Sequence, residues 1–187
     1  MDRQPVLKGA RLLLRPLEQG DWDALFAVAS DPLIWEVHPA SDRWQEPVFR
    51  EFFSDALAQG GALAVIDRAS GTIVGSSRIQ AYDPADGGSV EIGWTFLARS
   101  HWGGAFNREM KRLMLEHCFR FVERVDFRVG ESNVRSRRAM EKIGGQLSER
   151  GGSVVDTVSG PVPHVVYEID RDSFAVGPLS PSGSASA

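Results

Sequence analysis

Two adjacent glycines, Gly103 and Gly104, separate a strand-like segment from a segment with helical periodicity. Before them, residues 89–97 (SVEIGWTFL) begin with alternating apolar and polar side chains, which favours a strand. After them, apolar residues recur at helical spacing over about 104–122, with Met110 and Met114 on the apolar face and Lys111 on the polar face. This order constrains the fold most, because the helix must pack its apolar face on the sheet with its N-terminus beyond the strand end.

The glycines have two physical interpretations. They allow a sharp turn, or they bring backbone N–H groups close to an anion at a helix N-terminus. A nucleoside-triphosphate loop would need Gly-Lys-Ser/Thr, and here Ala105, Phe106 and Asn107 follow the glycines. A dinucleotide-binding motif would need three spaced glycines, and only two are present. A pyrophosphate held by backbone N–H groups and a plain tight turn both remain open.

The rest of the chain alternates strand and helix signals. Strands are predicted at 10–17, 62–67, 73–82, 89–97, 125–130, 146–150 and 165–170, and helices from about 22, over 46–59, over about 104–122 and over 132–144. About seven strands and about four helices share one sheet, so the predicted class is α/β (α+β) with a mixed sheet.

Composition limits the function further. We expect a single domain over residues 1–174 and a disordered tail over 175–187, which lacks an apolar pattern. The one cysteine, Cys118, excludes an internal disulfide, and four scattered histidines argue against a metal site. A net charge of −4 argues against a nucleic-acid partner and suits a cationic acceptor. No signal sequence or membrane span is visible, so we expect a cytoplasmic protein.

Four short motifs together carry a family resemblance. They are Glu91-Ile92-Gly93-Trp94, Trp102-Gly103-Gly104-Ala105, Asn133-Val134-Arg135-Ser136 and Lys142-Ile143-Gly144. With the element order, they resemble the GNAT superfamily of N-acetyltransferases in its RimJ/RimL-like branch, over about residues 8–173. The resemblance implies a mostly antiparallel sheet in which the strand before the glycines splays from the next strand. It also implies transfer of the acetyl group of acetyl-CoA to a primary amine, on a protein N-terminus or a small molecule. The alternative is an acyl-CoA-binding module of the same fold without catalysis.

The resemblance also assigns residues to the cofactor. Pantetheine is expected in the gap beside the backbone of Phe96, Leu97 and Ala98. The pyrophosphate is expected at the loop and first helical turn, formed by Trp102, Gly103, Gly104, Ala105, Phe106, Asn107 and Arg108. Asn133 and Ser136 are expected near CoA, although Asn133 has an ordinary alternative as a helix cap. Two positions depart from the family pattern. Ser100 stands where Gln or Arg is usual, with Arg99 one residue earlier, and Met140 stands where many members have tyrosine.

Acetyl transfer to an amine needs a base for the amine and a proton for the thiolate. Glu91 is the candidate base, directly or through water, with Glu131 as competitor and an arginine ion pair as its ordinary alternative. Ser136 is the candidate donor, unless it is only a first-turn helix serine. The segment 35–44, which contains Trp35 and Trp44, borders the acceptor groove of this fold or plugs the edge of the core. The acceptor, and the choice between monomer and homodimer, are not determined by the sequence.

Overall fold

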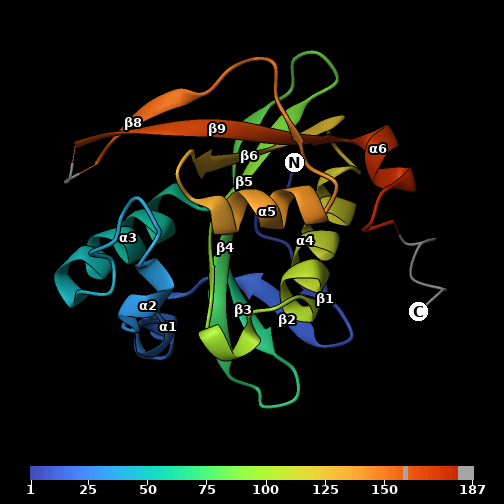
Figure 1. Cartoon of the computed structure of the whole chain (residues 1–187). Helices are drawn as coiled ribbons and strands as arrows, with labels where there is room; N and C mark the ends of the chain where they lie inside the picture. Colours follow the sequence, from blue (N-terminus) through green and yellow to red (C-terminus); the bar gives the residue numbers. More distant parts are fainter. Residues whose placement is uncertain (158–159, 181–187) are drawn as a thin grey trace.

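The computed structural model describes residues 1–157 and 160–180, whose nine strands form one mixed sheet (Figure 1). The strands are β1 (Leu7–Lys8), β2 (Leu12–Pro16), β3 (Ala62–Asp67), β4 (Ile73–Asp83), β5 (Ser89–Leu97), β6 (Arg124–Gly130), β7 (Gln146–Leu147), β8 (Ser153–Thr157) and β9 (Gly160–Asp170). Their order is β1-β2-β3-β4-β5-β6-β9-β7, and β8 pairs with β9. Among these described pairs, β5 and β6 are parallel and the others are antiparallel.

The helices begin where local sequence signals allow. They are α1 (Trp22–Ala29), α2 (Pro32–Trp35), α3 (Glu46–Gln59), α4 (Ala105–Cys118), α5 (Val134–Lys142) and α6 (Arg171–Val176), with short 3-10 turns at η1 (Gln19–Asp21) and η2 (Arg99–His101). The Asp31 carboxylate accepts the Leu33 N–H to cap α2, which has Pro32 in its first turn. Gly60 ends α3 with a φ of 68°, a value that glycine adopts readily.

Each face of the sheet carries its own hydrophobic core. Alternation along β3 shows the division, because Leu63 and Val65 point to one core while Ala62 and Ala64 point to the other. Helices α4, α5 and α6 supply the first core, and α1, α2 and α3 supply the second. Figure 1 shows α1–α3 gathered on one side of the sheet and α5 crossing in front of it near α4.

Strands β5 and β6 separate soon after they pair. Their register covers only Ser89, Val90 and Glu91 of β5, opposite Arg124, Val125 and Asp126 of β6. Beyond this point β5 is bent by a bulge, where its register with β4 shifts and Trp94 has a φ of 53°. The predicted splay between the strand before the glycines and the next strand is therefore present.

The predicted fold class is confirmed, and three details of the sequence analysis are wrong. Helix α4 ends at Cys118 rather than near residue 122. Lys111 was placed on the polar face but is buried, because its ammonium group contacts Thr95 of β5 and Phe127 of β6. The C-terminal segment stays ordered past residue 174, since α6 reaches Val176 and Leu179 joins the core. The rest of the predicted tail, 181–187, lies outside the described residues. No described helix is long and apolar enough to cross a membrane.

Candidate functional site

The Gly103–Gly104 loop forms an open cradle at the N-terminus of α4. Gly103 and Gly104 have φ values of 93° and 138°, which side-chain-bearing residues rarely adopt. A Cβ built on either glycine would meet no atom within 4 Å, so the space in front of the loop is empty. In the described residues, no acceptor takes the N–H groups of residues 103–107. The cradle therefore presents unpaired donors at the positive end of a helix dipole.

Two of the predicted cofactor contacts are already used inside the protein. The Ala98 N–H donates to the Val74 carbonyl at 2.8 Å, and the Ala98 carbonyl accepts the His101 N–H at 2.8 Å. The Arg108 N–H donates to the Gly104 carbonyl at 3.0 Å as part of the first helical turn. The Arg108 N–H, which was expected to face the phosphate, and the Ala98 N–H are therefore both paired inside the protein, because helix formation and strand pairing take them first.

Leu97 is the residue of β5 that faces the gap with its backbone. Its neighbour Phe96 directs its carbonyl toward Gly75 of β4, and strand alternation turns Leu97 the opposite way. The indole N–H of Trp102 donates to the Leu97 carbonyl at 2.9 Å, on the gap side. This leaves the Leu97 N–H as the donor that β5 offers to a chain lying in the gap.

The N-terminus of α5 lies across the gap from the glycine loop. Arg135 reaches over this opening, with its guanidinium carbon 4.2 Å from the centre of the Trp102 ring and one nitrogen 3.1 Å from the Ile34 carbonyl. The sequence motifs indicate Trp102 as a site residue but give no signal for its contact with Arg135. Arg135 thus brings a positive charge to the mouth of the gap, beside the unpaired N–H groups of the cradle.

Asn133 and Ser136 sit at the start of α5. The Asn133 side chain accepts the Ser136 N–H at 3.0 Å, so it caps the helix as its ordinary alternative predicted. The Ser136 hydroxyl is half-buried and has no hydrogen-bond partner among the described residues. Met140, at the position of the family tyrosine, is buried in the core and carries no transferable proton.

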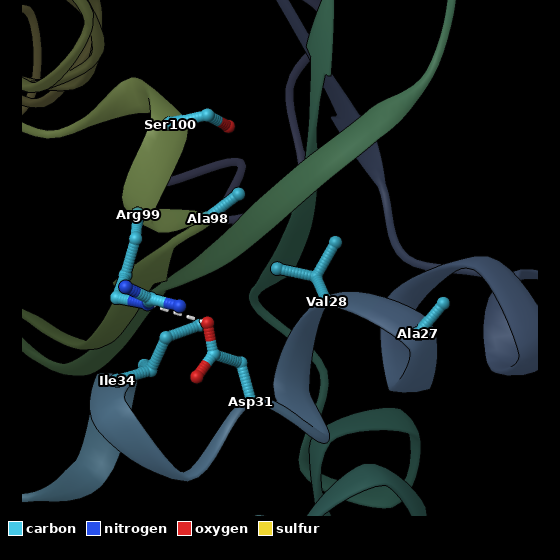
Figure 2. Close-up of a pocket in the computed structure, with 7 residues that line it drawn as sticks. All are labelled: Ala27, Val28, Asp31, Ile34, Ala98, Arg99 and Ser100. Carbon is cyan, nitrogen blue, oxygen red and sulfur yellow. Dashed lines mark hydrogen bonds and ion pairs between the residues drawn. The ribbon is translucent and has the colours of Figure 1, made fainter.

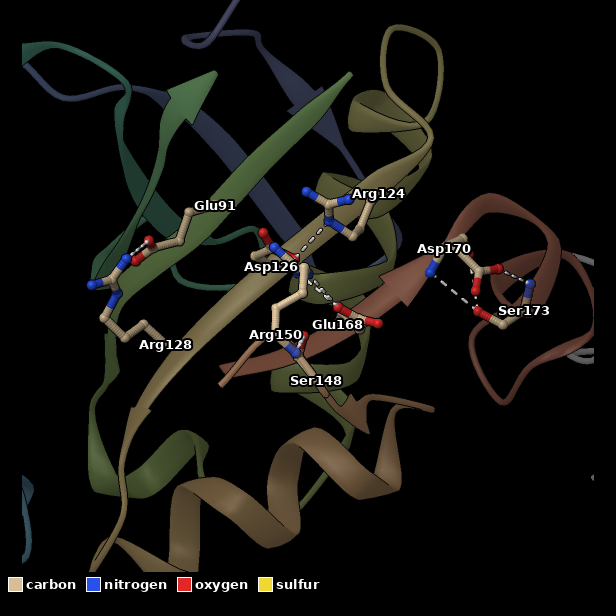
Figure 3. Close-up of polar contacts among 9 residues, drawn as sticks. All are labelled: Glu91, Arg124, Asp126, Arg128, Ser148, Arg150, Glu168, Asp170 and Ser173. Atoms are coloured by element: carbon tan, nitrogen blue, oxygen red, sulfur yellow. Dashed lines mark hydrogen bonds and ion pairs between the residues drawn. The ribbon is translucent and has the colours of Figure 1, made fainter. Parts of the chain in front are cut away.

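Glu91 lies on the sheet face opposite to α4, beside the point where β5 and β6 part (Figure 3). Its carboxylate accepts Gln80 Nε2 at 3.0 Å on one oxygen, and Arg128 lies 3.4 Å from the other. The arginine pairing foreseen as the ordinary alternative is therefore present. The Glu91 side chain remains 12% exposed, so water can reach the carboxylate.

A pocket of about 570 Å³ adjoins the end of β5 (Figure 2). Its lining comes from α1, α2 and η2, and Asp31 and Arg99 meet at its rim with an N–O distance of 2.5 Å. The hydrogen bond from Arg99 holds the pKa of Asp31 below its usual value. The guanidinium of Arg99 is therefore already paired with a carboxylate at the rim of this pocket.

The segment 35–44 contains one tryptophan in the core and one at the surface. Trp35 is buried and donates its indole N–H to the Ala29 carbonyl at 2.7 Å, which matches the core alternative. Trp44 is exposed instead. Burial, followed by the charges of Arg43 and His164, lowers the pKa of His38 to about 3, so this imidazole is neutral.

Sequence reasoning missed three buried cations near the gap. Arg43 and Arg78 lie on the α3 side of β5, and Lys111 of α4 donates to the Thr95 hydroxyl at 2.8 Å. Each would be read as a solvated charge in the sequence, and only tertiary packing shows their burial. Cys118 is buried as expected, and burial raises the pKa of its thiol to about 12. Within 1–157 and 160–180, no cluster of three or more His, Cys, Asp or Glu residues could hold a metal ion.

Comparison with known proteins identifies the family. Residues 11–146 match the family model described as an acetyltransferase (GNAT) domain. A GCN5-related N-acetyltransferase from Brucella melitensis superposes with a TM-score of 0.78 at 22% identity, over 91% of this chain and 80% of that one. Mycobacterium smegmatis RimJ in complex with CoA-disulfide gives 0.63 at 20% identity, over 87% and 83%. Spermidine N-acetyltransferase from Vibrio cholerae, in complex with CoA and spermine, gives 0.64 at 18% identity, over 89% and 99%. At these identities the structures show the shared fold.

Proposed function

Because this chain belongs to the GNAT acetyltransferase family, we propose that it transfers the acetyl group of acetyl-CoA to a primary amine in a ternary complex. The observation that carries the proposal is the cradle at Gly103 and Gly104, with its unpaired N–H groups beside the splayed strands. We assign the chain to the RimJ/RimL-like branch on its four motifs. The solved complexes of RimJ with CoA-disulfide and of spermidine N-acetyltransferase with CoA and spermine support the choice of cofactor.

The residues present fit acetyl-CoA. The N–H groups of residues 103–107 would hold the pyrophosphate, because they point from a helix N-terminus into empty space. Arg135 adds a positive charge at the same opening. The Leu97 N–H would bind the pantetheine chain along the free edge of β5, while Trp102 fixes the Leu97 carbonyl. Asn133 supports this wall by capping α5.

Acetyl-CoA supplies a thioester, whose C–S bond breaks as the amine nitrogen forms the new C–N bond and the sulfur leaves with the bonding electron pair. Glu91 takes the proton that the nitrogen loses, through a water, because its two oxygens are engaged by Gln80 and Arg128. Ser136 donates its hydroxyl proton to the sulfur and regains a proton from water, since its hydroxyl has no other partner in the described chain.

The test has two stages. Acetyl-CoA should raise the melting temperature of the wild-type chain, and a panel of primary amines should then release free CoA thiol. Gly103→Val should abolish the melting shift, because valine is strained at a φ of 93° and fills the cradle. Gly151→Val is the matched control, since Gly151 has a φ of 85° and equally open surroundings in the loop before β8, where its neighbour Arg150 pairs with Asp126 and Glu168.

The two family alternatives separate in the second stage. A buried Met140 in place of the tyrosine is the observation that favours a non-catalytic acyl-CoA-binding module. If acetyl-CoA binds and no amine releases thiol, this module is the correct function. If Gly103→Val keeps full affinity, the loop is only a turn and the proposed cofactor site is wrong.

A further inference from the structure

Two arginines are buried around the same pair of aromatic rings, next to the bulge in β5. Arg43 lies in the segment before α3, and its guanidinium carbon is 4.6 Å from the centre of the Phe52 ring and 5.3 Å from that of Trp94. Arg78 of β4 lies 5.9 Å and 5.6 Å from the same two rings. Arg43 and Arg78 are only 9% and 4% exposed, so two like charges share one desolvated cage.

The cage holds more positive charge than the protein neutralises. Arg78 NH1 pairs with Asp55 at 2.9 Å, but the Asp55 side chain is 50% exposed, and Arg78 Nε and NH2 are buried without a partner. The Arg43 guanidinium has neither a hydrogen bond nor an ion pair among the described residues. The negative charge of Asp42, its neighbour in the sequence, favours the charged form of Arg43. Burial, and then repulsion from Arg78, lower the pKa of Arg43 to about 10. Unpaired buried charges are costly, so such a cage requires an explanation.

The cage is joined to the proposed base by a short chain of side chains. The indole N–H of Trp94 donates to Gln80 Oε1 at 2.7 Å, and Gln80 Nε2 donates to Glu91 at 3.0 Å. Trp94 therefore forms one wall of the cage and is also tied to the carboxylate that would receive the amine proton. An acceptor with its amine near Glu91 would therefore extend over Trp94 toward Arg43.

We propose that Arg43 and Arg78 bind a carboxylate of the acceptor, so that the preferred substrates are amino acids or compounds with an amino acid's charge pattern. This inference rests on the proposed acetyl transfer and names its acceptor class. Arg43 makes the contact, because it is the less buried of the two arginines, has no partner of its own, and its planar fork matches the two carboxylate oxygens. Arg78, deeper and anchored by Asp55, adds its charge to the same site.

The experiment compares acceptors that differ in one charge. Each L-amino acid is tested beside its own carboxamide, together with O-phosphoethanolamine, ethanolamine and spermidine, by release of CoA thiol. We expect the wild-type chain to prefer the acid over the amide by about 10- to 100-fold in kcat/KM. Arg43→Gln should remove this preference by raising KM for the acid while the amide is unaffected. Arg43→Lys should restore part of it, because it keeps the charge without the fork.

Arg50→Gln is the control, since Arg50 is an exposed arginine of α3 that stacks on Trp22 away from the cage. It should leave the preference intact. Three outcomes would overturn the carboxylate site while acetyl transfer stands. The wild-type chain could use acid and amide equally, it could prefer spermidine to every amino acid, or it could prefer O-phosphoethanolamine. An equal loss for acid and amide in Arg43→Gln would show that Arg43 is structural.

A second readout tests the site without turnover. With CoA present, an excess of the amino acids should raise the melting temperature of the wild-type chain and not that of Arg43→Gln. Arg43→Gln alone should melt no lower than the wild type, because it removes an unpaired buried charge. If thiol release fails with every amine, acetyl transfer is wrong, and this melting difference still decides whether the anion site exists.

Discussion

Replacing Lys111 with methionine should raise the free energy of unfolding at neutral pH, and this gain should disappear at high pH. Lys111 is 2% exposed, and its ammonium group contacts the Thr95 hydroxyl at 2.8 Å and the Phe127 ring at 5.3 Å. No carboxylate of the described chain pairs with it. Methionine has a similar length and an adaptable, uncharged chain, so it fills the same space.

The size of the effect follows from the pKa of Lys111, which burial lowers from 10.5 to about 7. Between these two values the unfolded chain holds a proton that the folded chain has released, so the free energy of unfolding rises with pH. Each pH unit is worth about 1.4 kcal/mol, which gives an upper bound of about 5 kcal/mol for the full penalty. The loss of unfolding free energy caused by Lys111 reaches its full size below about pH 7 and vanishes above about pH 10.5.

The assay is urea unfolding followed by tryptophan fluorescence at several pH values between about 6 and 10. Lys111→Met should exceed the wild type by several kcal/mol at the acidic end, and the difference should shrink steadily toward zero. Lys142→Met is the control, because Lys142 is exposed on α5 and its loss should change stability by less than about 0.5 kcal/mol. A Lys111→Met protein that is less stable at every pH, or a difference independent of pH, would refute the reasoning.

Three further substitutions test the site and its support. Glu91→Gln should lower kcat by about 100-fold or more and leave acetyl-CoA affinity unchanged, as measured by steady-state kinetics and melting shifts; an unchanged kcat would remove Glu91 from the mechanism. Ser136→Ala should lower kcat without altering stability, and equal turnover would leave Ser136 as an ordinary helix residue. Asp21→Asn should lower the free energy of unfolding by about 2 to 4 kcal/mol in urea, because Asp21 is 8% exposed and holds Arg15 by two contacts of 2.6 and 2.7 Å. A loss below about 0.5 kcal/mol would mean that the desolvation of the two charges cancels the attraction between them.

Elements with strong local signals could be predicted from the sequence. Helix α3 has the predicted bounds, because its phenylalanines recur at helical spacing and Gly60 stops it. Strands β3 and β5 also match. Strand β7 was predicted over 146–150 and covers only Gln146–Leu147. Strands β1 and β8 were not predicted, because β1 contains only two residues and β8 depends on pairing with β9. Such pairing is a tertiary event that a local pattern does not encode.

The candidate site divides in the same way. The cradle at Gly103 and Gly104 follows from local rules, since glycine before an amphipathic helix leaves N–H groups free. Whether a particular N–H group or charged side chain is free to bind a ligand depends on neighbours that are remote in the sequence. Ala98 is paired with Val74 of β4, and Lys111 is buried because β5 and β6 enclose it. A strand or helix pattern specifies which face a residue occupies, but not whether a second layer covers that face.

Charge shows the same contrast between the whole chain and one site. The net charge of −4 suits a cationic acceptor, whereas Arg43, Arg78 and Arg128 place three positive groups around Glu91 and Trp94. Surface charges farther away than about 8 to 10 Å are screened at physiological salt. Buried charges interact more strongly with a nearby ligand charge, because the effective dielectric constant around them is lower. The buried arginines therefore outweigh the distant acidic surface, and they favour an amine that carries its own carboxylate over a polyamine.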